Sequence, residues 1–106
     1  LFCASNVYTY PAGVNSGTAE AGPDYDCLLT QQNPAWYHLR ICTPGDLNVE
    51  MSTSPAEDID YICWGPFDEP YAPCSGMLNS SNQQDCSYSI ASTESFSLTN
   101  TQTGEY

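Results

Sequence analysis

Positive charge is almost absent from this sequence. Its 106 residues include no lysine, one arginine (Arg40) and one histidine (His38), against thirteen acidic residues, and the formal net charge is −12. Recognition of nucleic acid depends on clustered lysine and arginine, so the sequence excludes nucleic acid as a partner. Attachment to an anionic membrane surface is excluded for the same reason. Divalent cations, neutral sugars and protein surfaces remain as candidate partners.

Long apolar runs and closely spaced cysteine pairs are also missing. No run approaches the ~20 apolar residues of a membrane span, so we expect no membrane insertion. Metal–thiolate sites favour Cys-x-x-Cys pairs, which do not occur here. An even number of cysteines instead predicts a disulfide framework and an extracellular or cell-surface location. The six are Cys3, Cys27, Cys42, Cys63, Cys74 and Cys86.

The cysteine spacing and the expected strands lead to a specific pairing. One bridge would tie the N-terminal strand to the segment before Trp36, and a second would close a polar loop. The third follows by elimination and would join two strands. We therefore expect the bridges Cys3–Cys27, Cys74–Cys86 and Cys42–Cys63.

Turn formers and short alternating segments indicate an all-β chain. Eight prolines and seven glycines are scattered along it, and no apolar pattern keeps a helical period over a useful window. Alternation is clearest in residues 35–42 and 47–53. If these segments are hairpin neighbours, Ile41 opposes Val49 or Leu47, and the first choice places Arg40 opposite Glu50. We predict one domain over residues 1–106, a disulfide-stapled antiparallel β-sandwich of the jelly-roll or CUB type.

The C-terminal pattern predicts that this sandwich lacks its last strand. Phe96 and Leu98 mark a strand, and residues 100–104 form a turn that should lead into a partner strand beginning at Tyr106. One edge beside residues 95–99 would then be open. The chain also begins without a basic or apolar leader, and we expect it to be a segment of a larger protein.

Several motifs resemble a known family. They are Cys27-Leu28, residues 33–37 (NPAWY), residues 44–47 (PGDL), residues 58–67 (DIDYICWGPF), residues 85–89 (DCSYS) and Gly104-Glu105-Tyr106. Together they resemble a β-sandwich domain of large secreted Bacteroidota proteins that are surface- or gliding-associated and exported by the type IX route. The layout is also similar to pre-peptidase C-terminal domains and, more distantly, to CUB domains. The resemblance implies a non-catalytic accessory or adhesive role, and family members continue past the final Gly-x-Tyr into an apolar strand.

Acidic residues near expected strand ends are candidate calcium ligands. Calcium takes six to eight oxygen ligands, largely carboxylates and carbonyls. The candidates are Asp24, Asp58, Asp60 and Asp68, and the similarity to CUB domains implies calcium at such positions. Solvated carboxylates that blunt a sheet edge are the alternative interpretation.

Two tryptophans are candidate ligand-stacking residues. Trp36 or Trp64 on a solvent face would stack on a sugar or a partner protein. The alternative is that both tryptophans fill the core or cover a disulfide, as in other sandwiches.

Catalytic motifs are missing from the sequence. There is no Gly-x-Ser-x-Gly elbow and no glycine-rich phosphate loop, although the abundant serines leave a Ser-His-Asp arrangement open. We predict that the protein is not an enzyme. We expect an extracellular recognition or adhesion module, stabilised by calcium, that binds a protein or glycan surface ligand. The alternative is a structural subunit or fragment of an extracellular assembly, completed by a strand from a neighbouring chain.

Overall fold

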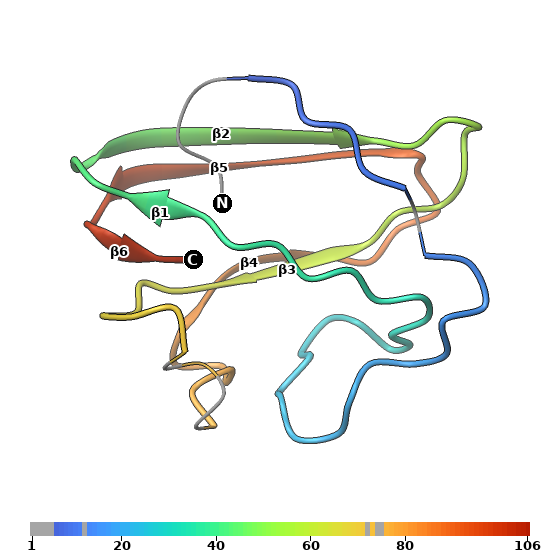
Figure 1. Cartoon of the computed structure of the whole chain (residues 1–106), viewed down its shortest axis with the longest axis horizontal. Helices are drawn as coiled ribbons and strands as arrows, with labels where there is room; N and C mark the ends of the chain where they lie inside the picture. The colour runs from blue at the N-terminus through green and yellow to red at the C-terminus, as the bar shows by residue number, and fades with distance from the viewer. Residues whose placement is uncertain (1–5, 12, 72, 74–75) are drawn as a thin grey trace.

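Six short strands joined by long loops make up the described part of the chain, which is residues 6–11, 13–71, 73 and 76–106 of a computed structural model (Figure 1). The strands are β1 (Arg40–Ile41), β2 (Gly45–Ser52), β3 (Tyr61–Trp64), β4 (Gln83–Ser87), β5 (Thr93–Thr101) and β6 (Gly104–Glu105). Within those residues there is no α-helix, and nothing helical is long and apolar enough to cross a membrane.

The strands pair antiparallel, β2 with β5, β3 with β4 and β1 with β6. The predicted all-β, antiparallel class is therefore confirmed. The three pairs form three two-stranded sheets rather than two continuous layers, and the sandwich arrangement stays a prediction. The N-terminal strand expected from the sequence is absent among described residues 6–11, where Val7 and Tyr10 lie in exposed irregular backbone.

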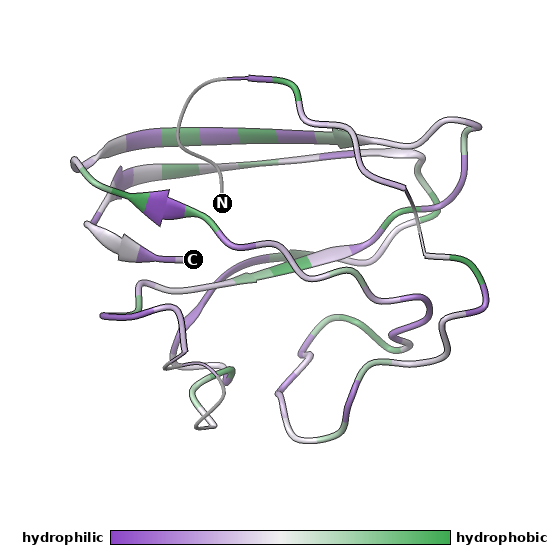
Figure 2. Cartoon of the chain, in the orientation of Figure 1, coloured by the Kyte–Doolittle hydropathy of each residue, from purple (hydrophilic) through white to green (hydrophobic). Residues whose placement is uncertain are grey.

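The ribbon of β2 and β5 follows the predicted alternation. Leu47, Val49 and Met51 are partly buried, and the residues between them are exposed. The colours of Figure 2 alternate along β2 accordingly. Leu98 lies opposite Leu47, and Phe96 lies opposite Val49, so directly paired side chains share the inward face. This period-two pattern specifies the register, because a shift of one residue would turn the apolar set towards solvent.

The β3–β4 pair is joined to the long loop of residues 14–34 by a disulfide between Cys27 and Cys86. The predicted bridges Cys3–Cys27 and Cys74–Cys86 are therefore wrong. Hydrogen bonds place the loop beside β4 and the segment before it, because Gln83 Nε2 donates to Asp26 Oδ2 at 2.8 Å and Asp24 N donates to Leu78 O at 2.8 Å. The loop folds against β4, which brings two cysteines 59 positions apart in the sequence to a Cα separation of 6.2 Å.

The predicted Cys42–Cys63 bridge is also wrong, since both residues are free thiols. Cys42 lies in the exposed bend after β1, and Cys63 lies within β3, which pairs with β4 rather than with β1. Cys3 and Cys74 lie outside the described residues.

The β1–β6 pair differs most from the predicted register. Ile41 lies opposite Gly104 rather than Val49, and Arg40 lies opposite Glu105 rather than Glu50. The two consecutive strands β1 and β2 belong to different sheets, so they are not hairpin neighbours. The strand at the C-terminal end of the chain was predicted to form a hairpin with residues 95–99. This prediction is also wrong, because β6 pairs with β1. Within the described residues β5 pairs with only one strand, β2. That the sandwich lacks its last strand therefore stays a prediction.

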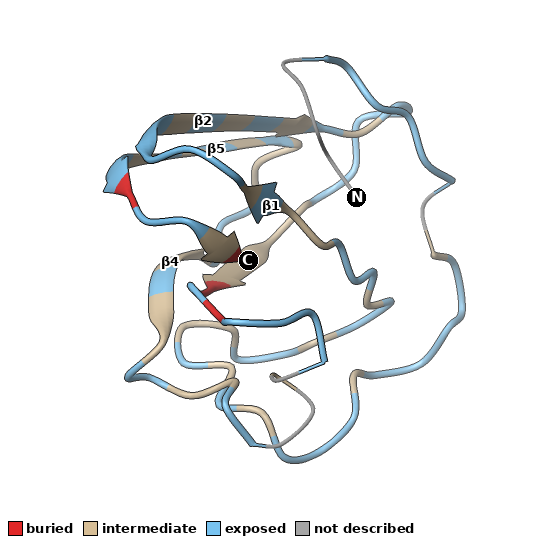
Figure 3. Ribbon diagram, turned by 60° about the vertical axis from the view of Figure 1, so that its left-hand side comes forward, coloured by how far each residue is buried: buried red, intermediate tan, exposed pale blue. Residues whose placement is uncertain are grey.

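Four side chains of the described residues are buried, at the ends of β3, β5 and β6 and in the segment that follows β3. They are Trp64, Phe67, Thr101 and Glu105, which are 6%, 4%, 6% and 3% exposed (Figure 3). Two of these four side chains are polar, one of them a carboxylate. The buried side chains of the described residues therefore include a charged group, the Glu105 carboxylate, and the candidate site lies around it.

Candidate functional site

Three segments that are distant in sequence meet around Glu105. The backbone of Phe67 exchanges two hydrogen bonds of 2.9 Å with Glu105, and Leu39 exchanges bonds of 2.8 and 2.7 Å with Tyr106. The last residues of the chain therefore lie between the segment that enters β1 and the segment that leaves β3.

Two glycines allow this close approach. A Cβ atom added to Gly65 would lie 2.5 Å from the ring of Tyr106, and one added to Gly104 would lie 2.8 Å from the Cβ of Pro66. Both glycines have φ near +147°, a conformation that other residues rarely adopt. The Gly65-Pro66-Phe67 and Gly104-Glu105-Tyr106 motifs are thus two halves of one contact.

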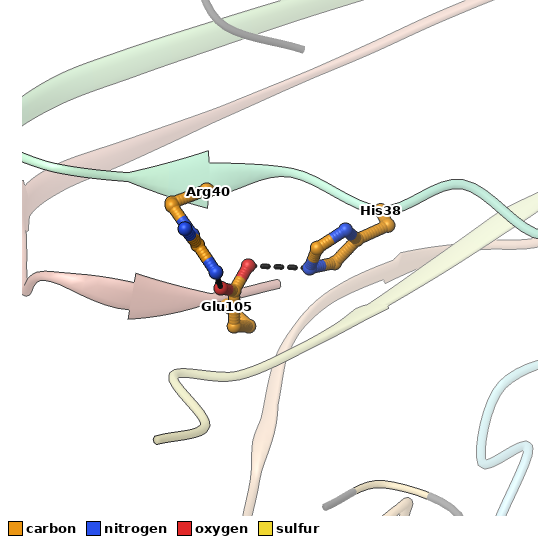
Figure 4. Close-up of polar contacts among 3 residues, drawn as sticks. All are labelled: His38, Arg40 and Glu105. Atoms are coloured by element: carbon orange, nitrogen blue, oxygen red, sulfur yellow. Dashed lines mark hydrogen bonds and ion pairs between the residues drawn. The ribbon is translucent and has the colours of Figure 1, made fainter. Parts of the chain in front are cut away.

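The only arginine and the only histidine of the chain both reach the Glu105 carboxylate (Figure 4). Arg40 is the cross-strand partner of Glu105, so their side chains share a face of the sheet. Its Nε and Nη2 atoms each lie 2.5 Å from Glu105 Oε1. His38, two residues before Arg40, projects to the same side and directs Nε2 to Oε2.

Burial and the two partners act in opposite directions on Glu105. Burial alone would raise the pKa of its carboxyl group, but the hydrogen bond from Arg40 and the charges of His38 and Arg40 outweigh this effect and lower the pKa. Each carboxylate oxygen already has a basic partner, so the group is held as an anion rather than poised to transfer a proton. The cluster is therefore a buried electrostatic clip between β1 and β6.

A shallow groove of about 430 Å³ lies beside this clip. Its lining includes Arg40, Cys42, Phe67 and Asp68. The Cys42 thiol is exposed there. Cys63, by contrast, is largely enclosed, and burial together with the nearby Asp85 carboxylate raises the pKa of its thiol to about 11. Cys63 is therefore protonated at neutral pH and is a poor nucleophile.

The two tryptophans stack on each other, and they are not equivalent. Their ring centroids are 5.9 Å apart with an interplanar angle of 21°, and Tyr25 lies edge-on to Trp64 at 6.1 Å. Trp64 is 6% exposed, so its ring belongs to the core. Trp36 is 49% exposed. Trp36 stacks on Trp64, which in turn packs against Tyr25, and we call this arrangement the Trp36 platform.

The four candidate calcium ligands do not form one cluster. Asp24 accepts a hydrogen bond from the backbone of Asp26, Asp60 accepts one from the backbone of Ser89, Asp58 is exposed ahead of β3, and Asp68 lines the groove. Among the described residues no three His, Cys, Asp or Glu side chains gather as a metal site would require. Calcium binding stays a prediction.

Sequence reasoning did not single out Glu105. Its position in the closing Gly-x-Tyr motif was visible, but a carboxylate at the penultimate position of the chain carries no local signal of burial. The scarcity of basic residues was the signal that could have indicated such a site. With only one arginine and one histidine, both on the same strand face, a buried carboxylate of this chain is expected next to them.

Comparison with known proteins adds no relative to this description. No protein-family model matches the chain, and no significant match occurs among curated proteins or solved structures.

Proposed function

We propose that this chain is a non-catalytic recognition or adhesion module that acts outside the cell. The Trp36 platform carries the proposal. Trp36 is half-exposed yet fixed from behind by Trp64, so a ligand would meet a rigid aromatic face with little loss of side-chain freedom. The Cys27–Cys86 disulfide supports an extracellular setting, and so does the resemblance of the motifs to secreted β-sandwich domains.

The net negative charge of the chain restricts the chemical class of the ligand. A net charge of −12 disfavours acidic glycans, so the apolar face of a neutral sugar ring is the ligand that best fits the Trp36 platform. An aromatic or apolar side chain on another protein is the alternative occupant. Calcium belongs to the proposal as a stabilising ion near Asp58 and Asp60.

Replacing Trp36 with alanine is expected to weaken ligand binding at least about tenfold, because an aromatic side chain that the ligand covers contributes a large share of the binding energy. Binding of the purified domain to an array of neutral oligosaccharides, followed by calorimetry, measures this effect. Trp36→Phe should retain part of the affinity, and Tyr71→Ala, which removes an exposed ring elsewhere, should retain all of it. Equal binding by the Trp36→Ala variant would contradict the platform. Binding to a protein ligand alone would point to the alternative occupant.

Calcium is expected to raise the melting temperature more than sodium chloride of equal ionic strength. Both salts screen the −12 charge, but a specific site adds a saturable mass-action term. Thermal melts at constant ionic strength, with calcium and with chelator, measure the difference, and Asp58→Asn should reduce it. Superimposable melts would show that the carboxylates are only solvated surface charge.

A further inference from the structure

The outer edge of β2 is an unpartnered strand edge. Through its ladder with β5, β2 uses one set of its backbone donors and acceptors, and the alternate set points away from β5. Within the described chain no backbone hydrogen bond joins Gly45–Ser52 to any other segment. In Figures 1 and 3, β5 lies between β2 and the other strands, so this edge is on the outside of the pair.

The outer side of β5 is less open than that of β2. Tyr61 stacks on Phe96 with ring centroids 5.1 Å apart, and the Tyr61 hydroxyl donates to the carbonyl of Ser95 at 3.4 Å. Ile59 N also donates to Ala91 O just before β5. The segment entering β3 therefore covers part of that side, and β2 carries the edge that a new strand can extend.

The side chains of β2 specify what such a strand must look like. Leu47, Val49 and Met51 are partly buried, whereas Asp46 and Glu50 are exposed, with Asp46 at the irregularity in register between Gly45 and Leu47. A shallow hollow of about 270 Å³ at the end of the ribbon is lined by Glu50 and Glu94. A strand added to this edge continues both faces, so it needs apolar residues at alternate positions and basic residues between them.

A second copy of this chain does not meet that requirement. Each copy carries a net charge of −12, and its only arginine contacts its own Glu105. We propose that β2 binds an extended segment of a basic partner protein by strand addition, with lysine or arginine side chains against Asp46 and Glu50. This surface is separate from the Trp36 platform, and the two proposals fail independently.

The test uses a blocked peptide of alternating valine and lysine, eight residues long like β2. We expect it to bind, to slow hydrogen exchange of amides in residues 45–52, and to bind more weakly as salt increases. A valine–glutamate peptide should not bind.

Two charge variants locate the binding surface. Asp46→Asn/Glu50→Gln should weaken binding about fivefold to tenfold. Asp46 accepts a hydrogen bond from Asn100 N at 3.0 Å, and the side-chain oxygen that the substitution keeps at this position can still accept it, so this variant should fold. Glu20→Gln/Glu57→Gln removes the same charge at exposed sites elsewhere and should change affinity less than about twofold.

Two backbone-methylated peptides separate strand addition from simple charge attraction. One carries N-methyl groups on its valines and the other on its lysines, so both keep every charge. A strand edge uses only alternate amides, and we expect one peptide to lose binding and the other to keep it. Equal binding by both peptides, protection of residues 93–101 instead of 45–52, or equal loss in the two charge variants would overturn the proposal.

Discussion

Replacing Arg40 with alanine is expected to destabilise the protein by about 3 kcal/mol, although the Arg40 side chain itself is half-exposed. The reason is the carboxylate that it leaves behind. Glu105 is 3% exposed, and without Arg40 it keeps only His38 as a partner. An uncompensated buried charge costs several kcal/mol, whereas a released surface arginine is solvated. Denaturant unfolding of the two proteins measures the difference.

The opposite change should cost less. Glu105→Gln keeps the shape of the side chain and removes the buried charge, and the arginine turns to water, so we expect a loss of about 1.5 kcal/mol. The double variant Arg40→Ala/Glu105→Gln should be more stable than Arg40→Ala alone. Glu50→Gln, the exposed carboxylate that a β1–β2 hairpin would place opposite Arg40, is the matched control and should change stability by less than about 0.5 kcal/mol. An Arg40→Ala variant as stable as Glu105→Gln would contradict the electrostatic clip.

The same cluster has a pH signature. The pKa of Glu105 is lower in the folded protein than in the unfolded chain, because its two basic partners outweigh the effect of burial. Its stabilising contribution is therefore complete above the unfolded pKa and is lost as pH falls through the folded pKa. Stability of the Glu105→Gln protein should accordingly fall less steeply on acidification than that of the original protein.

Local pattern was sufficient to predict strand β2 and its buried face, and insufficient to predict the partner of β2 or the clip. Leu47, Val49 and Met51 alternate with polar residues, and alternation alone specifies which face of β2 is buried. The partner of β1 depends instead on long-range topology. The chain turns away after Cys42, and the segment that reaches Arg40 comes from positions 104–105. Charge composition restricts what Arg40 can neutralise but does not say which of thirteen carboxylates lies beside it.

The tryptophans and cysteines show the same limit. Sequence reasoning named both Trp36 and Trp64 as candidates, and only the packing of Tyr25 and Trp36 against Trp64 distinguishes the exposed ring from its support. For the cysteines, spacing favoured short loops. The structure joins Cys27 to Cys86 because the loop of residues 14–34 folds along β4. This long-range contact leaves no periodic pattern in the sequence from which it could be predicted.

Removing the Cys27–Cys86 bridge is expected to cost about 4 kcal/mol. The bridge spans 59 residues, and in the chain-entropy model a loop of that length restricts the unfolded ensemble by roughly this amount. Domains of this size are stable by only about 5–15 kcal/mol, and few side chains are deeply buried here, so much of the margin would be lost. Unfolding of Cys27→Ser/Cys86→Ser in denaturant measures the effect, and Cys42→Ser, at an exposed free thiol, is the matched control.

Peptide mapping without reduction checks the premise of that experiment. After native thiols are blocked, peptides that contain Cys27 should be recovered joined to peptides that contain Cys86, with Cys42 carrying the blocking group. Cys63 should be modified only after denaturation, because burial raises the pKa of its thiol to about 11 and limits access to it. Recovery of Cys27 joined to Cys3 would instead tie the long loop to the N-terminus. The loop would then no longer be fixed along β4, and the stability loss expected for the double variant would have to be assigned to a different loop closure.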